Sequence, residues 1–288
     1  MRVAFLAAAT GLLVLSSAPA AGVMHRNGLI AFTHQNVSAE NLIFVMRPDG
    51  SGQRALTPAT RGGYYPAWSP DGRKIAYIDP RGRLAVMNAD GSGTRILTHD
   101  AGGFDDASPQ WSPNGKRIVF EVNVKFLTTI KTDGSAEHRL RAGLNPDWSP
   151  DGKQLVFVDL DGLVATVGVD GRGFRRLTHT GCADSPRWSP DGKRIVLVLA
   201  GDCLDPHRIA VLLASGKGLH RVTSKRARPR WNRLADWSPD GRKIVFSAGR
   251  EDGPVGNVYV MNADGSHRQQ LTSSGYDFDP SWQPLSGK

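Results

Sequence analysis

The chain has 288 residues and a formal net charge of +9, and its 40% hydrophobic and 22% charged content is ordinary for a folded soluble protein. No apolar stretch beyond residue 22 is long enough to cross a membrane, which excludes a helical span in the mature chain. The 33 glycines and 18 prolines indicate many tight turns. The positive charge favours anionic partners such as lipid headgroups or acidic polysaccharide, although a solvated basic surface is the commoner explanation.

The N-terminus carries the pattern of a secretory signal peptide. A short basic start, Met1-Arg2, precedes an apolar run over residues 3–15 and a small-residue cleavage signal, Ala18-Pro19-Ala20. We therefore predict that residues 1–20 are cleaved and that the protein is extracytoplasmic, either periplasmic or secreted. A buried first strand or a membrane anchor is the alternative.

Three short apolar runs, residues 28–32, 41–46 and 54–57, then predict the second, third and fourth strands of a sheet whose first strand is missing. A repeat follows. Trp-Ser-Pro-Asp-Gly, a basic residue and an apolar run recur at Trp68, Trp148, Trp188 and Trp237, with a near-copy at Trp111 and a truncated one at Trp282. The tryptophans lie 37 to 49 residues apart, and such a period indicates a repeat architecture.

Each repeat predicts four short antiparallel strands. Ser-Pro-Asp-Gly supplies the first turn, Ala-Asp-Gly-Ser a hairpin such as that at residues 89–92, and Leu-Thr ends the last strand. Four strands per 40 residues make one propeller blade. The fold class is therefore all-β, a single six-bladed propeller over residues 21–288. We expect residues 28–57 and 276–284 to share the blade that closes the ring, which removes exposed sheet edges.

The residues just before each tryptophan lie on the innermost strands and should line the central channel. Among them are Gln110, Asp147, Arg187 and Asp236, and Arg187 falls between the two aspartates in ring order. A channel-lining ion network is the plainer interpretation, and a small polar ligand bound across the ring is the alternative.

Cys182 and Cys203 are the only two cysteines. In a four-stranded blade, the loop before the first strand and the loop between the second and third strands lie on the same face, and the two cysteines occupy one of each in the same blade. We therefore predict a disulfide, worth roughly 3 kcal/mol on a chain-entropy basis, with two unpaired thiols as the alternative.

That same face carries a cationic loop around a tryptophan outside the repeat register. Basic side chains interleaved with an aromatic ring can grip a phosphate or carboxylate while stacking on a ring or sugar. The alternative is an ordinary solvated loop with no binding role. The predicted binding residues are Lys225, Arg226, Arg228, Arg230, Trp231 and Arg233.

Signals for other chemistry are weak. No nucleophile elbow, zinc-binding helix motif, phosphate loop or dinucleotide fingerprint occurs, and we expect no catalytic residue, metal or cofactor. His99 and His179 occupy equivalent places two blades apart and are interpreted as exposed loop histidines, with metal binding as the alternative. Five aspartates precede the first strands of their blades, and we interpret them as turn formers. A bound cation is the alternative. These residues are Asp105, Asp106, Asp184, Asp277 and Asp279.

The combination of PxWSPDGxxIxF with IYVMNADGxxxxxLT resembles the repeat of TolB-type β-propellers, over roughly residues 28–284. That family includes the periplasmic TolB component of the Tol–Pal system, propellers fused to peptidase domains and some sugar-acid lyases. TolB carries an α/β domain before its propeller, whereas here the propeller begins near the cleavage site, so contacts of that domain do not transfer.

The resemblance implies an exported, non-enzymatic binding module or scaffold. We expect a monomer, because propellers usually close on themselves. A protein or an anionic cell-envelope component is the expected partner, and nucleic acid is not expected. The alternative is an enzyme or small-ligand binder of lyase or hydrolase type with its site at the channel mouth. A purely structural role in the envelope is a third option.

Overall fold

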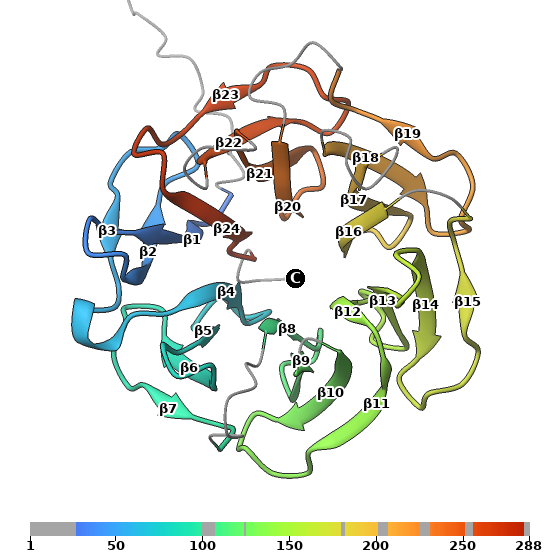
Figure 1. Ribbon diagram of the computed structural model, residues 1–288, viewed down its shortest axis with the longest axis horizontal. Coiled ribbons are helices and arrows are strands. Elements are labelled where there is room, and N and C mark those ends of the chain that lie inside the picture. Colours follow the sequence, from blue (N-terminus) through green and yellow to red (C-terminus); the bar gives the residue numbers. More distant parts are fainter. Residues whose placement is uncertain are drawn as a thin grey trace, which may run out of the picture.

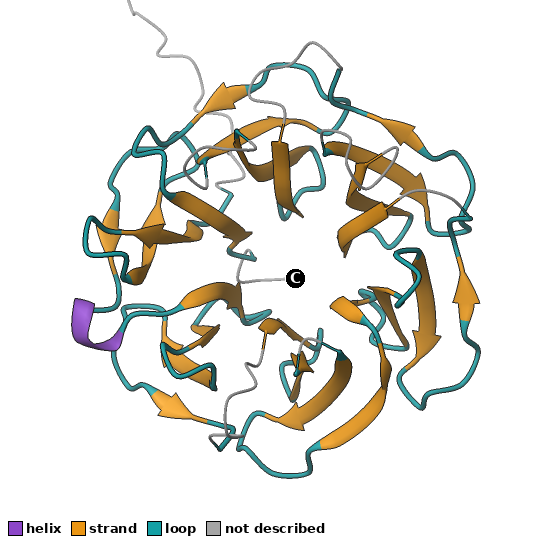
Figure 2. Ribbon diagram, in the orientation of Figure 1, coloured by secondary structure: helices purple, strands orange, loops and turns teal. Residues whose placement is uncertain are grey.

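The computed structural model describes residues 27–99, 107–123, 125–179, 182–200, 207–224, 231–250 and 256–284. They form six four-stranded antiparallel sheets arranged as a ring (Figure 1). Apart from one short 3-10 helix, Ala59–Arg61, the described residues are strands, turns and loops (Figure 2). The predicted fold class, an all-β six-bladed propeller, is confirmed.

The closing blade is assembled from both ends of the described chain, as the sequence predicts. Its strand order is β24-β1-β2-β3, with Ile30 of β1 opposite Trp282 of β24. Four of the six residues of β1 therefore pair with the last strand, and the ring has no open edge between its first and last blades. The strands are β24 (Asp277–Trp282), β1 (Ile30–Gln35), β2 (Asn41–Met46) and β3 (Arg54–Ala55).

The other five blades follow in chain order and are numbered one to five here. Blade one holds β4 (Tyr64–Trp68), β5 (Lys74–Ile78), β6 (Leu84–Asn88) and β7 (Arg95–Ile96). Blade two holds β8 (Ala107–Trp111), β9 (Arg117–Val122), β10 (Phe126–Lys131) and β11 (His138–Ala142). Blade three holds β12 (Leu144–Trp148), β13 (Gln154–Val158), β14 (Val164–Gly168) and β15 (Arg175–Arg176).

Blade four holds β16 (Cys182–Trp188), β17 (Arg194–Ala200), β18 (Arg208–Leu213) and β19 (His220–Arg221). Blade five holds β20 (Trp231–Trp237), β21 (Lys243–Gly249), β22 (Asn257–Asn262) and β23 (Gln269–Gln270). In every blade the strand that ends in the repeat tryptophan is nearest the axis (Figure 1).

The core lies between blades, which explains why the second and third strands are apolar on both faces. One cluster joins Ile78 and Leu84 of blade one to Trp111 and Phe120 of blade two, and five similar clusters follow around the ring. The indole N–H of Trp111 donates to the carbonyl of Ala67 in the preceding blade at 3.1 Å. The repeat tryptophans therefore bind neighbouring blades together.

The repeated turns are held by their own side chains. In the first one, Ser69 donates to Asp71 at 2.6 Å, and Asp71 accepts the backbone N–H of Arg73 at 3.0 Å. The threonine of Leu-Thr also forms a bond within its own blade: Thr98 Oγ1 accepts the backbone N–H of Leu84 at 2.9 Å. The same bond recurs fourteen residues back from Thr57, Thr178, Thr223 and Thr272.

The molecule thus has two distinct faces. The turn face carries the Ser-Pro-Asp-Gly turns, which join the first and second strands of a blade. The loop face is the opposite one, where first strands begin and where second strands connect to third strands. Both ends of the propeller axis are candidate binding sites, and each is described in turn below.

Candidate functional site

Six residues with positive φ form a ring around the axis, one from each blade and each three residues before a repeat tryptophan. Their φ angles lie between 28° and 55°. The register of each first strand shifts at this point, as expected for a β-bulge. Non-glycine residues in this conformation are strained, and such strain is common at functional sites. This axial ring consists of Tyr65, Ser108, Asn145, Ser185, Leu234 and Asp279.

The bulges follow from proline in the repeat. In five blades proline stands directly after the axial-ring residue, at Pro66, Pro109, Pro146, Pro186 and Pro280. Proline has no N–H for the strand ladder and is tolerated in a sheet mainly at edges and bulges. The Pro-x-Trp motif therefore signals the bulge, and the residue before that proline is the one to examine for a site.

Carboxyl groups gather at the axial ring with little water around them. Asp279 is 8% exposed and accepts hydrogen bonds from the backbone N–H of Tyr65 and the hydroxyl of Thr33. Burial raises the pKa of Asp279 to about 7. Glu121, on β9, is 2% exposed and accepts the backbone N–H of Asn145 at 2.5 Å, and burial raises its pKa as well.

Hydrogen bonds connect three blades across the ring. Ser108 Oγ donates to Asn145 Oδ1 at 2.9 Å, and Asn145 Nδ2 donates to Asp184 Oδ1 at 2.6 Å. Tyr65 completes the group: the charge of Asp279 and then burial raise the pKa of its phenol. His207 is half-buried near Asp184, and burial lowers its pKa. The loop-face side of the axis therefore presents proton donors and acceptors from several blades.

Asp184, Asp277 and Asp279 do not form turns ahead of their strands, contrary to the sequence-based interpretation. They lie within β16 and β24, because those first strands begin earlier than the motif suggested. Asp277 accepts a bond from Ser274 Oγ at 2.6 Å, and its other oxygen is 2.7 Å from His34 Nδ1. Asp105 and Asp106 lie outside the described residues.

The predicted channel residues directly precede the repeat tryptophans and therefore lie nearer to the turn face than the axial ring does. Gln110, Arg187 and Asp236 line a small axial cavity of about 20 Å³ together with Tyr65 and Asp279, which is room for about one water molecule. The axial passage is therefore narrow at the level of the ring.

Direct ion pairs do not hold these channel residues together. Arg187 donates to the carbonyl of Pro186 at 2.9 Å and lies within 4.0 Å of no carboxylate in the described part of the chain. Asp147 and Asp236 instead accept the backbone N–H of Trp188 and Trp282, at 2.7 and 2.8 Å. The predicted network is thus a set of carboxylate-to-backbone bonds between blades, with Arg187 contributing at longer range. Burial raises the pKa of Asp147 to about 6.

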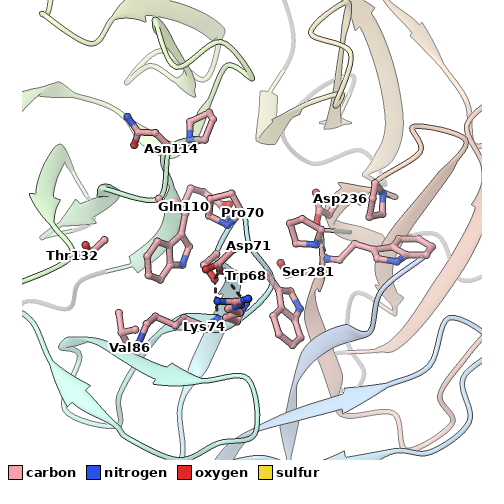
Figure 3. A pocket seen from close by; sticks show the side chains of 18 of the residues that line it. Trp68, Pro70, Asp71, Lys74, Val86, Gln110, Asn114, Thr132, Asp236 and Ser281 are labelled. Atoms are coloured by element: carbon pink, nitrogen blue, oxygen red, sulfur yellow. Dashed lines mark hydrogen bonds between the residues drawn. The ribbon is translucent and has the colours of Figure 1, made fainter. Parts of the chain in front are cut away.

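On the turn face the axis opens into a vestibule of about 1090 Å³ (Figure 3). Gln110, Asp236 and Ser281 lie around its floor, and Trp68, Lys74 and Asn114 belong to its wall. The second proline of each repeat forms its rim: Pro70, Pro113, Pro150, Pro190, Pro239 and Pro284. This cavity was not predicted, although the recurring Trp-Ser-Pro was the signal for it.

The predicted cationic loop is only partly within the described structure. Lys225, Arg226, Arg228 and Arg230 lie outside the described residues, and Trp231 begins β20. Arg233 is exposed on the same strand, and its charge reaches both His207 and Asp279. The described end of the cationic segment therefore leads toward the axial ring.

Cys182 begins β16 and is disulfide-bonded, while Cys203 lies outside the described residues. The pairing of these two cysteines stays a prediction. His99 and His179 are both exposed, and the described residues contain no group of three or more His, Cys, Asp or Glu side chains arranged to hold a metal ion. Among the described residues, no helix is long and apolar enough to span a membrane.

We expect non-reducing peptide mapping of the secreted protein to recover the peptides of Cys182 and Cys203 as one linked species. Changing Cys203→Ser should leave one titratable thiol and lower the free energy of unfolding by roughly 3 kcal/mol. Two free thiols in the unreduced protein would contradict the pairing.

Comparison with known proteins places the chain in context. Dipeptidyl-peptidase 5 of Porphyromonas endodontalis is 38% identical over 72 residues, which is 24% of this chain and 10% of that protein. The crystal structure of TolB from Acinetobacter baumannii superposes with a TM-score of 0.77 at 22% identity, over 90% of this chain and 67% of that one. An oligogalacturonate lyase from Vibrio parahaemolyticus superposes with a TM-score of 0.57 at 13% identity, over 84% of this chain and 79% of that one.

These structural likenesses show the fold alone, and the curated relative is matched over only a tenth of its length. The family profile described as the TolB beta propeller domain (PD40) matches residues 140–288, which is more than half of the chain. Together with the Trp-Ser-Pro-Asp-Gly repeats and the six blades, this match shows that the chain belongs to the TolB beta propeller domain family.

Proposed function

We propose that this protein is a non-enzymatic binding module that works outside the cytoplasm after loss of residues 1–20. Its partner is a protein or an anionic component of the cell envelope, held at the loop face. The observation that carries the proposal is the convergence of polar side chains at the axial ring, with the cationic segment ending beside it at Arg233.

The cationic segment and the axial ring suit different chemical groups of one partner. The cations of residues 225–233 suit carboxylate or phosphate groups of a partner. The axial ring offers both donors and acceptors, among them Tyr65, Asn145 and Asp184, so it suits a peptide or polar head group that enters the mouth of the propeller. Association through charge should weaken as salt rises.

The test is capture of partners by the mature protein from the extracytoplasmic fraction of its source, by cross-linking and mass spectrometry. We expect a specific partner that is lost when Lys225, Arg226, Arg228 and Arg230 are changed to Ser. The matched control removes four exposed cations away from the loop face, Arg54, Arg172, Lys217 and Arg221. Equal capture by the two variants would contradict the proposed site.

The second candidate is an enzyme or small-ligand binder at the same mouth. It is favoured by the carboxyl groups of Asp279 and Glu121, whose pKa values burial raises beside the phenol of Tyr65. Carboxyl groups shifted in this way are frequent among catalytic acids and bases. Turnover of an acidic oligosaccharide or a peptide that Asp279→Asn abolishes would favour this candidate over the binding module.

A further inference from the structure

The turn face carries a second set of features that the loop-face function does not use. Two basic residues follow the glycine of the Ser-Pro-Asp-Gly-type turn in four blades, and one follows it in blade three, where Gln154 takes the second position. Because the blades repeat, these positions recur on the turn face, where Arg73 and Lys74 line the vestibule. They hold nine cations in five blades: Arg73, Lys74, Lys116, Arg117, Lys153, Lys193, Arg194, Arg242 and Lys243.

The first cation of each pair is free to meet a partner. All five side chains are exposed, and within the described part of the chain none of them has a side-chain hydrogen bond or an ion pair. Their backbone N–H groups donate to the Asp or Asn of the turn, and their backbone carbonyls accept N–H groups of the outer hairpin of the same blade. We call this set the cationic collar: Arg73, Lys116, Lys153, Lys193 and Arg242.

The carboxylates nearest the cationic collar are already occupied. Asp71, Asp151, Asp191 and Asp240 each accept the serine hydroxyl of their own turn and a backbone N–H. A further set of aspartates belongs to the outer hairpins between third and fourth strands, where they accept backbone N–H groups, as Asp90 does from Ser92. The inner rim therefore holds more positive than negative charge and attracts anions.

The centre of this face is hollow and lined by rigid groups. The vestibule of about 1090 Å³ is slightly larger than the usual range for ligand pockets, about 300–1,000 Å³. Four of the six prolines have their rings set against the turn of the next blade, which supports the rim of the vestibule. A Cβ placed on Gly115 would be 3.5 Å from Pro70, and one on Gly152 would be 3.8 Å from Pro113. The cavity is thus preformed.

From the cationic collar and the hollow on the same face, we infer that the turn face is a docking surface for an acidic, extended segment of a partner protein. The segment enters the vestibule between the prolines, and its carboxylates meet the cationic collar. Carboxylates stay at the rim, because the floor already holds Asp236, whose two oxygens accept the backbone N–H groups of Trp237 and Trp282. A concave, proline-lined centre suits a chain segment better than a flat lipid surface.

The probe is a fluorescein-labelled peptide of alternating glutamate and glycine, with a glutamine-for-glutamate twin, measured by fluorescence anisotropy. The full chain should bind the acidic peptide with an affinity that falls as salt rises, and should not bind the twin. Changing Arg73, Lys116, Lys153, Lys193 and Arg242 to Ser should weaken binding at least about tenfold.

A matched control keeps the net charge of that variant. It changes Arg54, Arg61, Arg81, Arg221 and Arg250 to Ser, all of them exposed and lying either on the outermost strands or on the loop face. This control should bind the peptide as the parent does, and an equal loss would overturn the inference. Should the fivefold variant fold poorly, the double variant R73S/K74S removes the two cations that line the vestibule and should also weaken peptide binding.

Two further arms separate this inference from its rivals. Binding to phosphatidylglycerol vesicles or to oligogalacturonate without binding to the acidic peptide would overturn it in favour of a lipid or polysaccharide surface. The loop-face variant at Lys225, Arg226, Arg228 and Arg230 should retain peptide binding. The experiment therefore tests the docking surface on the turn face separately from the proposed loop-face partner.

Discussion

Asp279→Asn should make the protein more stable at pH 8 and leave its stability at pH 4 nearly unchanged. Burial raises the pKa of Asp279 from its usual value near 3.8 to about 7 in the folded state. The folded chain therefore binds a proton there that the unfolded chain has already released. The stability that this carboxyl contributes is complete below about pH 4 and is lost as the pH rises through 7.

The size of the effect follows from that difference in pKa. Each pKa unit corresponds to about 1.4 kcal/mol, so the ionised side chain costs up to about 4 kcal/mol at pH 8. Asparagine keeps an oxygen that can accept the N–H of Tyr65 and the hydroxyl of Thr33, and it removes the charge. The variant should also titrate the phenol of Tyr65 at lower pH, because the charge of Asp279 is the main cause of its raised pKa.

Urea denaturation at a series of pH values between 4 and 8 measures the change. Asp170→Asn is the matched control, since Asp170 is exposed and accepts a backbone N–H from Arg172 in its hairpin. The control should follow the parent curve. If Asp279→Asn also followed the parent curve up to pH 8, Asp279 would not be a buried carboxyl with a raised pKa.

The repeat made most of the fold predictable. Trp-Ser-Pro-Asp-Gly and Leu-Thr form local turns and bonds, such as Ser69 to Asp71 and Leu84 to Thr98, so their spacing is enough to place the strands. The closing blade was predictable because the two fragments of the repeat complement each other. Strand ends were less predictable: β1 begins at Ile30 and runs to Gln35, beyond the apolar run that marked it.

The axial site was harder to find, because it depends on positions that vary between blades. Tyr65, Ser108, Asn145, Ser185, Leu234 and Asp279 share no residue type, and only their place before the bulge unites them. Glu121 carried a fainter signal, a lone acid in the apolar run of β9. Sequence reasoning selected the neighbouring channel positions, such as Asp147 and Asp236, whose carboxylates instead bind backbone amides of the next blade.

Closure of the ring also depends on contacts between the hairpin of one blade and the outer strand of the blade before it. The glycine of the Asp-Gly or Ser-Gly hairpin has a positive φ in all six blades. A Cβ placed on Gly265 would be 2.0 Å from the carbonyl oxygen of Val222, whereas one on Gly171 would have nothing within 4 Å. Gly171 belongs to blade three and faces blade two. The outer strand of blade two, β11, runs over five residues and lacks the Leu-Thr ending.

Gly265→Ala should therefore destabilise the protein much more than Gly171→Ala. Both variants force alanine into the left-handed region, which costs about 1–2 kcal/mol. Only Gly265→Ala also pushes blade five away from blade four, since backbone rather than a flexible side chain blocks the methyl group. Overpacking of this kind adds roughly 1–3 kcal/mol, for a total of roughly 2–5 kcal/mol.

Urea denaturation of the two variants at one pH separates the contact between blades from the backbone strain, because the hairpin position is the same. A large difference would mean that each blade is fixed by the hairpin of the next, so the axial ring keeps its geometry only while the propeller is closed. Equal losses for Gly171→Ala and Gly265→Ala would assign the whole cost to backbone strain. The boundary between blades two and three would then be no different from the others, despite its open hairpin glycine.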